Sequence, residues 1–204
     1  MPVASHAAAP PPPPPLDERR REEERHARQA LRERLARGPL LRAVAKQDVR
    51  AYRAIRKTAR PTGLHRAILL YSQSGEHAGL WLAVGGAGAL LDTPGQRPRW
   101  RRATTSVAVA YVLNTVLKSV FRRRRPSQDD LPHLTGTPTG LSFPSAHASS
   151  SFAAARAFSR LLPPVPLYVA ASAMALSRVY LGVHYPTDIA VGASIGYSVG
   201  CVGR

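Results

Sequence analysis

Five apolar segments follow one another over residues 78–202, and they constrain the fold more than any other feature of the chain. Each is as long as the roughly 20 residues that carry a helix across a bilayer, or slightly shorter. Ala, Gly and Ser are frequent in them, which allows membrane helices to approach closely. The segments are 78–91, 103–121, 147–162, 164–181 and 188–202. They predict an all-α protein, a transmembrane helical bundle with about five spans.

A soluble helical bundle is the competing interpretation. None of the segments has the length and the Leu and Ile density of an unambiguous span, and the mean hydropathy of the chain is −0.18. The N-terminal region explains much of that low average, because 16 of the 29 Lys and Arg residues lie in the first 66 positions. We therefore expect a multi-pass protein of a bacterial plasma membrane.

The sequence before the apolar segments divides into two parts. Residues 1–15 are rich in proline and lack the apolar core of a signal peptide, which predicts a disordered or polyproline II tail. Residues 16–62 are strongly basic and predict a solvated charged helix followed by an amphipathic helix. The second helix could lie on anionic phospholipid or pack against the remaining domain, residues 63–204.

Charge and cysteine content limit the partners. The net charge of +17 suits phospholipid head groups, nucleic acid or a phosphorylated substrate. Tyr52 is the one aromatic residue of the N-terminal region, and no nucleic-acid motif occurs, so we expect no nucleic-acid partner. Cys201 is the single cysteine, which excludes an internal disulfide. Nothing in the sequence fixes the oligomeric state.

The ionisable residues of the apolar region gather at the ends of the segments. Successive helices alternate in direction, so these ends are expected at one face of the bundle. Each residue alone has an ordinary explanation, such as a head-group contact for the arginines or an N-cap for Asp188. Together they indicate a functional site. The residues are Lys118, Arg122 to Arg125, His147, Arg178, His184 and Asp188.

Three stretches in this region resemble the signature motifs of the type 2 phosphatidic acid phosphatase family, which also includes acid phosphatases and vanadium haloperoxidases. They are KSVFRRRRP (118–126), PSAH (144–147) and SRVYLGVHYPTD (177–188). The resemblance covers roughly residues 78–203. The family usually has glycine where Ala146 stands. Alanine suits a helix N-terminus, so we expect activity to survive this departure.

The residue types in these stretches suit phosphoryl transfer. Charge spreads over the equatorial oxygens of a phosphoryl group in transfer, so catalysis consists mainly of positioning and fixed positive potential. Lys118, Arg125 and Arg178 can supply that potential, and the planar arginine fork matches two phosphate oxygens. Ser145 and the backbone N–H groups that begin the next helix, near Ala146, would add donors.

The resemblance implies roles for the remaining residues. His184 would attack phosphorus to form a phosphohistidine, and Asp188 would bind the other ring nitrogen of His184. His147 would protonate the leaving alkoxide and then activate water. The implied mechanism needs no metal and no cofactor. Haloperoxidase activity is the less favoured use of such a site, and a membrane-anchored basic adaptor with an inactive bundle is the non-enzymatic alternative.

A lipid phosphate is the expected substrate, because the site would lie at the membrane surface. The chain is similar to small family members from high-GC bacteria, some of which act on decaprenylphosphoryl-ribose 5-phosphate. Phosphatidic acid, phosphatidylglycerol phosphate, polyprenyl phosphates or diphosphates and soluble phosphomonoesters stay open as alternatives. The membrane face that carries the site depends on whether residues 63–78 cross the bilayer, which the sequence leaves open.

Overall fold

The computed structural model describes residues 38–58, 63–127 and 130–203. The predicted tail over 1–15 and nearly all of the predicted charged helix lie outside these residues. Residues 47–204 form one compact unit, and the chain up to Lys46 belongs to another. The predicted domain boundary between residues 62 and 63 stays a prediction.

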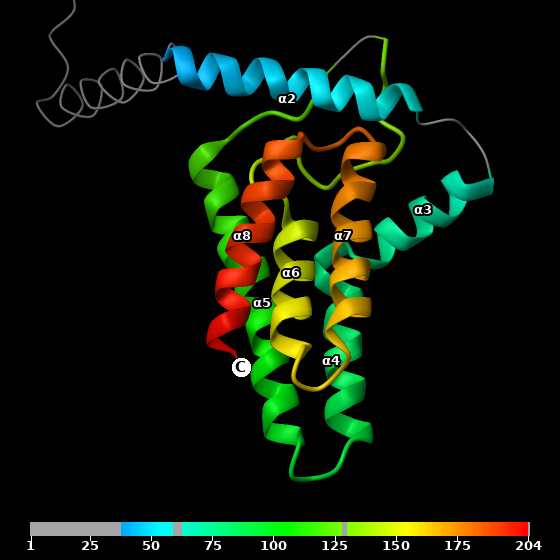
Figure 1. Cartoon of the computed structure of the whole chain (residues 1–204), viewed down its shortest axis with the longest axis vertical. Coiled ribbons are helices and arrows are strands. Elements are labelled where there is room, and N and C mark those ends of the chain that lie inside the picture. Colours follow the sequence, from blue (N-terminus) through cyan, green and yellow to red (C-terminus); the bar gives the residue numbers. More distant parts are fainter. Residues whose placement is uncertain (1–37, 59–62, 128–129, 204) are drawn as a thin grey trace, which may run out of the picture. The chain divides into compact units, whose positions relative to one another are not determined.

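The described residues form seven α-helices and one short 3-10 helix (Figure 1). No strand occurs among them, only an isolated bridge between Arg124 and Leu141. The predicted all-helical class is therefore confirmed. The helices are α2 (Pro39–Thr58), α3 (Gly63–Ser74), η1 (Glu76–Ala78), α4 (Gly79–Leu91), α5 (Arg97–Phe121), α6 (Ala146–Phe158), α7 (Pro164–Tyr180) and α8 (Pro186–Val202).

Proline and backbone conformation set several helix ends. A proline lies in the first turn of α5, α7 and α8, where its missing N–H leaves no bond unmade. At its other end α5 stops at Arg122, which adopts a left-handed conformation with φ 52° and donates its N–H to the Lys118 carbonyl. The chain then leaves the helix axis one turn after Lys118 and enters the long loop to α6.

Helix α6 forms the centre of the compact unit. Ten of its 13 residues are buried, and it packs against α5, α7 and α8 (Figure 1). Most of its buried side chains are Ala or Ser, which permits close packing. Glycines of α8 allow its backbone to approach α6 closely. A Cβ at Gly196 would lie 2.0 Å from the Ser149 carbonyl oxygen, and one at Gly200 would lie 2.7 Å from that of Ala153, so neither position has room for a side chain.

An apolar cluster fills the far half of the bundle. Trp81, Trp100 and Phe158 are at most 4% exposed there, and the Trp100 and Phe158 rings are 5.4 Å apart. Trp100 Nε1 donates to Asp92 Oδ2 at 2.8 Å, and Trp81 Nε1 donates to Ser151 Oγ at 2.7 Å. The N–H groups of both indoles are thus hydrogen-bonded. The polar residues of the bundle lie at its other end.

By length and apolar composition, α5 is the one described helix that could cross a membrane by itself. Its 25 residues extend about 38 Å at 1.5 Å per residue. The 17 residues of α7 and of α8 extend about 26 Å each. The helices coincide with the five predicted apolar segments to within a few residues, but the number of spans stays a prediction.

Candidate active site

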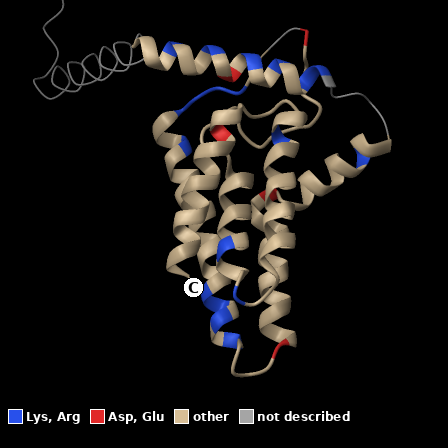
Figure 2. Cartoon of the chain, viewed as in Figure 1, with Lys and Arg blue, Asp and Glu red and all other residues tan. Residues whose placement is uncertain are grey.

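The helix ends that carry the predicted site residues meet at one end of the bundle. In Figure 1, α5 and α7 finish at the upper end, and α6 and α8 begin there. Lys118 is in the last turn of α5, Arg178 in the last turn of α7, and Asp188 in the first turn of α8. Figure 2 shows basic residues at both ends of α5 and few charges along its middle.

Arg125 extends from the loop after α5 into the segment that carries His184. Its Nη1 donates to the Val183 carbonyl at 2.7 Å and lies 3.4 Å from His184 Nε2. Its Nε donates to the Thr139 carbonyl at 2.8 Å. Burial lowers the pKa of Arg125 to about 10, while the nearby Asp188 carboxylate opposes that shift. The guanidinium is therefore a fixed positive charge beside Nε2 at neutral pH.

His184 is 1% exposed and lies in the loop between α7 and α8. Its Nδ1 is 3.4 Å from Asp188 Oδ2, too long and poorly aligned to count as a hydrogen bond. Catalytic hydrogen bonds often shorten to their final length only when substrate binds. Burial lowers the pKa of His184 well below 6.5, and the charges of Arg125, Lys118 and Arg178 lower it further. The imidazole is therefore neutral at physiological pH.

Asp188 is fully buried and has polar contacts on both carboxylate oxygens. Oδ1 lies 2.9 Å from Arg123 Nη1, and Oδ2 accepts the Tyr185 backbone N–H at 2.9 Å. The second contact closes the first turn of α8, so Asp188 also acts as a helix cap. The carboxylate is thus held in one place, facing Nδ1 of His184.

His147 and Arg178 meet at a shared neighbour, Ser72 of α3. His147 Nε2 is 3.1 Å from the Ser72 carbonyl oxygen, which can only accept, so this nitrogen carries the proton. Arg178 is 1% exposed, and its Nη1 donates to Ser72 Oγ. His147 is also within electrostatic reach of His184 and Lys118. Both histidines and all three predicted cations therefore belong to one cluster.

Ser145 and Ala146 begin α6 as the sequence predicts, but Ser145 is already engaged. Its Oγ caps the helix by accepting from Ala148 N at 3.5 Å, and its backbone N–H donates to the Asp188 carbonyl at 3.0 Å. The second bond ties the start of α6 to the start of α8. Ser145 thus has a structural role, and its hydroxyl hydrogen is what it can offer a phosphate. Ala146 is half-buried at the first helical position.

Lys118 donates to the Leu141 carbonyl at 3.3 Å from the last turn of α5. Its ammonium acts electrostatically on His184 together with Arg125 and Arg178. Two residues at helix ends and one in the loop after α5 thus produce one positive potential around His184, which can attract and hold a phosphate. We call Lys118, Arg125 and Arg178 the cation cluster.

Three residues of α2 make buried contacts near His184 that the sequence motifs do not predict. Asp48 Oδ1 accepts the Thr187 backbone N–H at 2.9 Å, and its Oδ2 pairs with Arg123 Nη2 at 2.7 Å. Tyr52, fully buried, donates to the Gly182 carbonyl at 3.3 Å. Arg56 donates to the Tyr180 and Pro132 carbonyls. These three residues, which we call the α2 stripe, contact the chain on both sides of His184.

The spacing of the α2 stripe can be recognised in the sequence. Asp48, Tyr52 and Arg56 stand at i, i+4 and i+8, on one helical face. The apolar face predicted for this helix included Tyr52 but also Val49 and Ile55, which are only half-buried. It left out Asp48 and Arg56 because they are charged. Of the two predicted alternatives for this helix, packing against the domain is the one found for residues 48–56.

No group of three or more His, Cys, Asp or Glu residues within the described ranges could hold a metal ion. Asp130, which the sequence places at the surface, is exposed and lies 3.6 Å from Arg53. Its neighbour Asp129 is outside the described residues.

Comparison with known protein families shows which family this chain belongs to. The family model for the PAP2 superfamily matches residues 99–203, which include the whole cation cluster, both histidines and Asp188. The chain belongs to the PAP2 superfamily. The family predicted from the three motifs is confirmed, and with it the expected class of enzyme, a phosphoric monoester hydrolase.

Two sequence relatives of this PAP2 protein are called decaprenylphosphoryl-5-phosphoribose phosphatase. The one from Mycolicibacterium smegmatis is 44% identical over 122 residues, 59% of this chain and 67% of the relative. The one from Mycobacterium tuberculosis H37Rv is 42% identical over 132 residues, 64% of this chain and 73% of the relative.

Solved structures resemble this PAP2 protein over most of its length. LpxE of Aquifex aeolicus has a TM-score of 0.65 and 25% identity, over 76% of this chain and 93% of that one. A transmembrane PAP2-type phosphatidylglycerolphosphate phosphatase of Bacillus subtilis has a TM-score of 0.65 and 23% identity, over 83% and 87%. The second likeness concerns the fold alone.

Proposed function

We propose that this chain is an integral-membrane phosphatase that removes the terminal phosphate of a lipid-linked phosphomonoester. The observation that carries the proposal is the position of His184, whose Nε2 faces Arg125 while its Nδ1 faces Asp188. A nucleophilic imidazole needs a free lone pair on one nitrogen and a partner on the other, together with positive charge where the phosphate binds. Here the cation cluster supplies the charge, and Asp188, 3.4 Å from Nδ1, is the partner that would come into hydrogen-bond distance when the phosphate binds.

In the first step, Nε2 of His184 attacks phosphorus while the bond from phosphorus to the ester oxygen breaks. The cation cluster holds the equatorial oxygens and offsets their charge. Asp188 accepts the Nδ1 proton in a hydrogen bond and stabilises the imidazolium that forms. His147, in its protonated form, gives a proton to the leaving alkoxide, so the products are the free alcohol and a phosphohistidine.

In the second step, His147 is the base. It takes a proton from water, and the water oxygen attacks phosphorus as the bond to His184 Nε2 breaks. Inorganic phosphate leaves, and both histidines return to their starting states. The hydrogen bond from His147 Nε2 to the Ser72 carbonyl fixes the orientation of the imidazole ring. A fixed ring suits a group that gives and takes a proton at the same place.

We propose that α4 to α8 provide five membrane crossings, in a plasma membrane, with the cation cluster at one surface. Large apolar side chains on their outer faces support this, because they would otherwise face water. Val112, Val116 and Val120 of α5 are more than half exposed, as are Val169 and Leu176 of α7. In this arrangement residues 63–204 are the membrane domain, preceded by the basic region 16–62 and the tail 1–15.

We propose a polyprenylphosphoryl pentose 5-phosphate as the substrate class. Support comes from the two relatives with 42–44% identity, each named for decaprenylphosphoryl-5-phosphoribose. A substrate of this kind has a phosphomonoester that can reach the cation cluster and a polyprenyl chain that stays in the bilayer.

A panel of lipid phosphates tests the function. Purified wild type and His184→Ala would be assayed for phosphate release from decaprenylphosphoryl-ribose 5-phosphate, phosphatidic acid and phosphatidylglycerol phosphate, with and without EDTA. We expect wild type to prefer the pentose phosphate, to be unaffected by EDTA, and to lose activity with the substitution. Release that survives His184→Ala contradicts the mechanism. No release by wild type from any lipid contradicts the enzyme and favours a membrane-anchored adaptor.

A further inference from the structure

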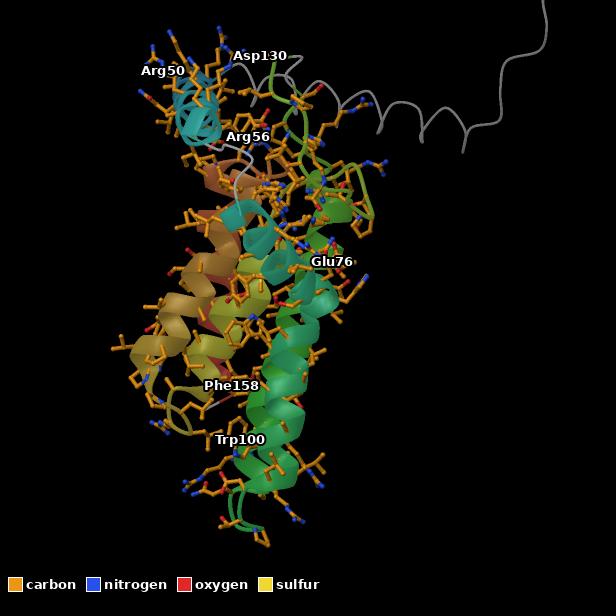
Figure 3. The ribbon with its side chains drawn as sticks, turned by 90° about the vertical axis from the view of Figure 1, so that its right-hand side faces the viewer. Arg50, Arg56, Glu76, Trp100, Asp130 and Phe158 are labelled. Atoms are coloured by element: carbon orange, nitrogen blue, oxygen red, sulfur yellow. The ribbon has the colours of Figure 1, made fainter. Side chains whose placement is uncertain are left out.

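A small polar cavity lies beside the candidate active site. Its volume is about 270 Å³, and its walls come from the end of α3, from η1 and from the loop between α5 and α6. Figure 3 labels one of its residues, Glu76, at the side of the bundle, well above Trp100 and Phe158 in that view. The lining residues are Gln73, Glu76, Thr135, Gly136, Thr137 and Pro138.

One wall of this cavity belongs to the segment that contacts His147 and Arg178. Gln73 follows Ser72, which contacts both His147 and Arg178. Glu76 follows Gly75, where an added Cβ would lie 2.9 Å from Cδ2 of His147. The Glu76 carboxylate also attracts the Arg178 guanidinium electrostatically. The segment that carries Gln73 and Glu76 therefore contacts His147, the proposed proton donor to the leaving oxygen, and Arg178.

The opposite wall is tied to Arg125. The loop residues that line the cavity continue into Thr139 and Gly140, whose carbonyls accept from Arg125 Nε at 2.8 Å and Arg125 N at 3.2 Å. Leu134 N donates to the Leu181 carbonyl at 2.9 Å, which joins the other end of the same loop to the His184 segment. Both walls are thus fixed to residues that surround the phosphate site.

The lining has the chemistry of a hydroxyl-binding site. A carboxylate accepts O–H donors, and the amide and the threonine hydroxyls both donate and accept. Within the part of the chain that the structure describes, neither the Gln73 nor the Glu76 side chain has a hydrogen bond or an ion pair. Thr137 Oγ1 donates to the Thr139 carbonyl at 3.2 Å, which leaves its oxygen as an acceptor.

The charge of the lining excludes other head groups. No Lys or Arg lines this cavity, so a phosphate inside it would be repelled by Glu76. The sugar ring fits this charge, whereas the phosphodiester that joins the ring to the polyprenyl chain must lie outside the cavity. A purely apolar group would remove water from Glu76 and Gln73 without replacing their hydrogen bonds, which is costly. A neutral group with several hydroxyls avoids both penalties.

We propose that this cavity binds the sugar ring of the substrate, with Gln73 and Glu76 hydrogen-bonded to its hydroxyls while its phosphate occupies the cation cluster. This rests on the proposed function and adds the residues that distinguish a sugar phosphate from a glycerolipid phosphate. The two residues are positioning and specificity residues, since the reacting atoms are at His184.

Two variants and three substrates test the proposal. Gln73→Leu and Glu76→Gln would be compared with wild type on decaprenylphosphoryl-ribose 5-phosphate, on its analogue without the two ring hydroxyls, and on phosphatidic acid. Gln96→Leu, in the loop before α5 at the far end of the bundle, is the matched control. Each hydrogen bond to a charged or amide group contributes a factor of about 10 to kcat/KM.

We expect each cavity variant to lower kcat/KM about 10-fold on the ribose substrate and less than about 2-fold on the dideoxy analogue and on phosphatidic acid. Gln96→Leu should match wild type on all three. If kcat/KM falls equally on every substrate, or does not fall on the ribose substrate, the result contradicts the sugar site but not the phosphatase function. Wild type that hydrolyses phosphatidic acid but not the ribose lipid overturns both the sugar site and the proposed substrate class, but leaves the phosphatase itself.

Discussion

Asp48 and Arg123 form an ion pair with 2.7 Å between Oδ2 and Nη2, although they are 75 residues apart in the sequence. The Asp48 side chain is 1% exposed, and the other guanidinium nitrogen of Arg123 contacts Asp188 at 2.9 Å. Arg123 therefore connects α2 to the carboxylate that faces His184. Asp48, which lies outside the three sequence motifs, thus contacts through Arg123 the carboxylate that faces the proposed nucleophile.

Asp48→Asn tests this connection. The substitution keeps the size of the side chain but removes the charge that Arg123 contacts, so Arg123 and with it Asp188 become less fixed. We expect kcat to fall about 10- to 100-fold with little change in KM, as for other small misplacements of catalytic groups. Kinetics on the preferred lipid phosphate would measure both constants.

Arg50→Gln provides the control for Asp48→Asn, because Arg50 is exposed on the same helix. It should leave kcat and KM near wild type. If Asp48→Asn has full activity, or if kcat falls equally in both variants, α2 does not orient the site.

The close contact between α8 and α6 predicts a stability difference between two glycine variants. A Cβ at Gly196 would be 2.0 Å from the Ser149 carbonyl oxygen, whereas one at Gly86 in α4 meets nothing within 4 Å. Gly196→Ala should reduce the free energy of unfolding by about 1–3 kcal/mol through overpacking. Gly86→Ala should raise it by up to about 1 kcal/mol, because alanine favours helix. Thermal unfolding in detergent measures both, and equal effects would contradict the packing.

The charge state of His184 can be measured directly. Burial first, and then three nearby cations, lower its pKa well below 6.5. A base with a lowered pKa keeps its neutral form to lower pH, so His184 should be neutral at pH 6.5, where an ordinary histidine is half protonated. Ring signals of ¹⁵N-labelled protein, assigned with a His184→Gln variant, report this. A midpoint at or above 6.5 would show that the site does not keep His184 neutral.

The sequence predicted the helices and the convergence of the helix ends because both depend on local pattern. Apolar segments bounded by Pro, Gly and Arg gave helix positions close to those observed, and alternating direction placed Lys118, His147 and Arg178 at one end. The roles assigned to these residues stay predictions, because they follow from the family resemblance and from geometry without a bound phosphate.

What the sequence could not predict depends on contacts between distant segments. The capping role of Ser145 and its bond to Asp188 need the relative position of α6 and α8. Asp48 and Ser72 lie outside every motif, and their contacts with motif residues depend on how distant segments pack. Buried charged residues in an amphipathic helix follow no apolar pattern, so hydropathy assigns them to the solvent side.

Trapping the covalent intermediate tests the central claim most directly. Wild type and His184→Ala would be mixed with a ³²P-labelled lipid phosphate and quenched in alkali within milliseconds. The account predicts an acid-labile, alkali-stable label on wild type that maps to the peptide containing His184, and no label on the variant. Rapid phosphate release by wild type without any such label, or a label that persists in His184→Ala, would contradict it.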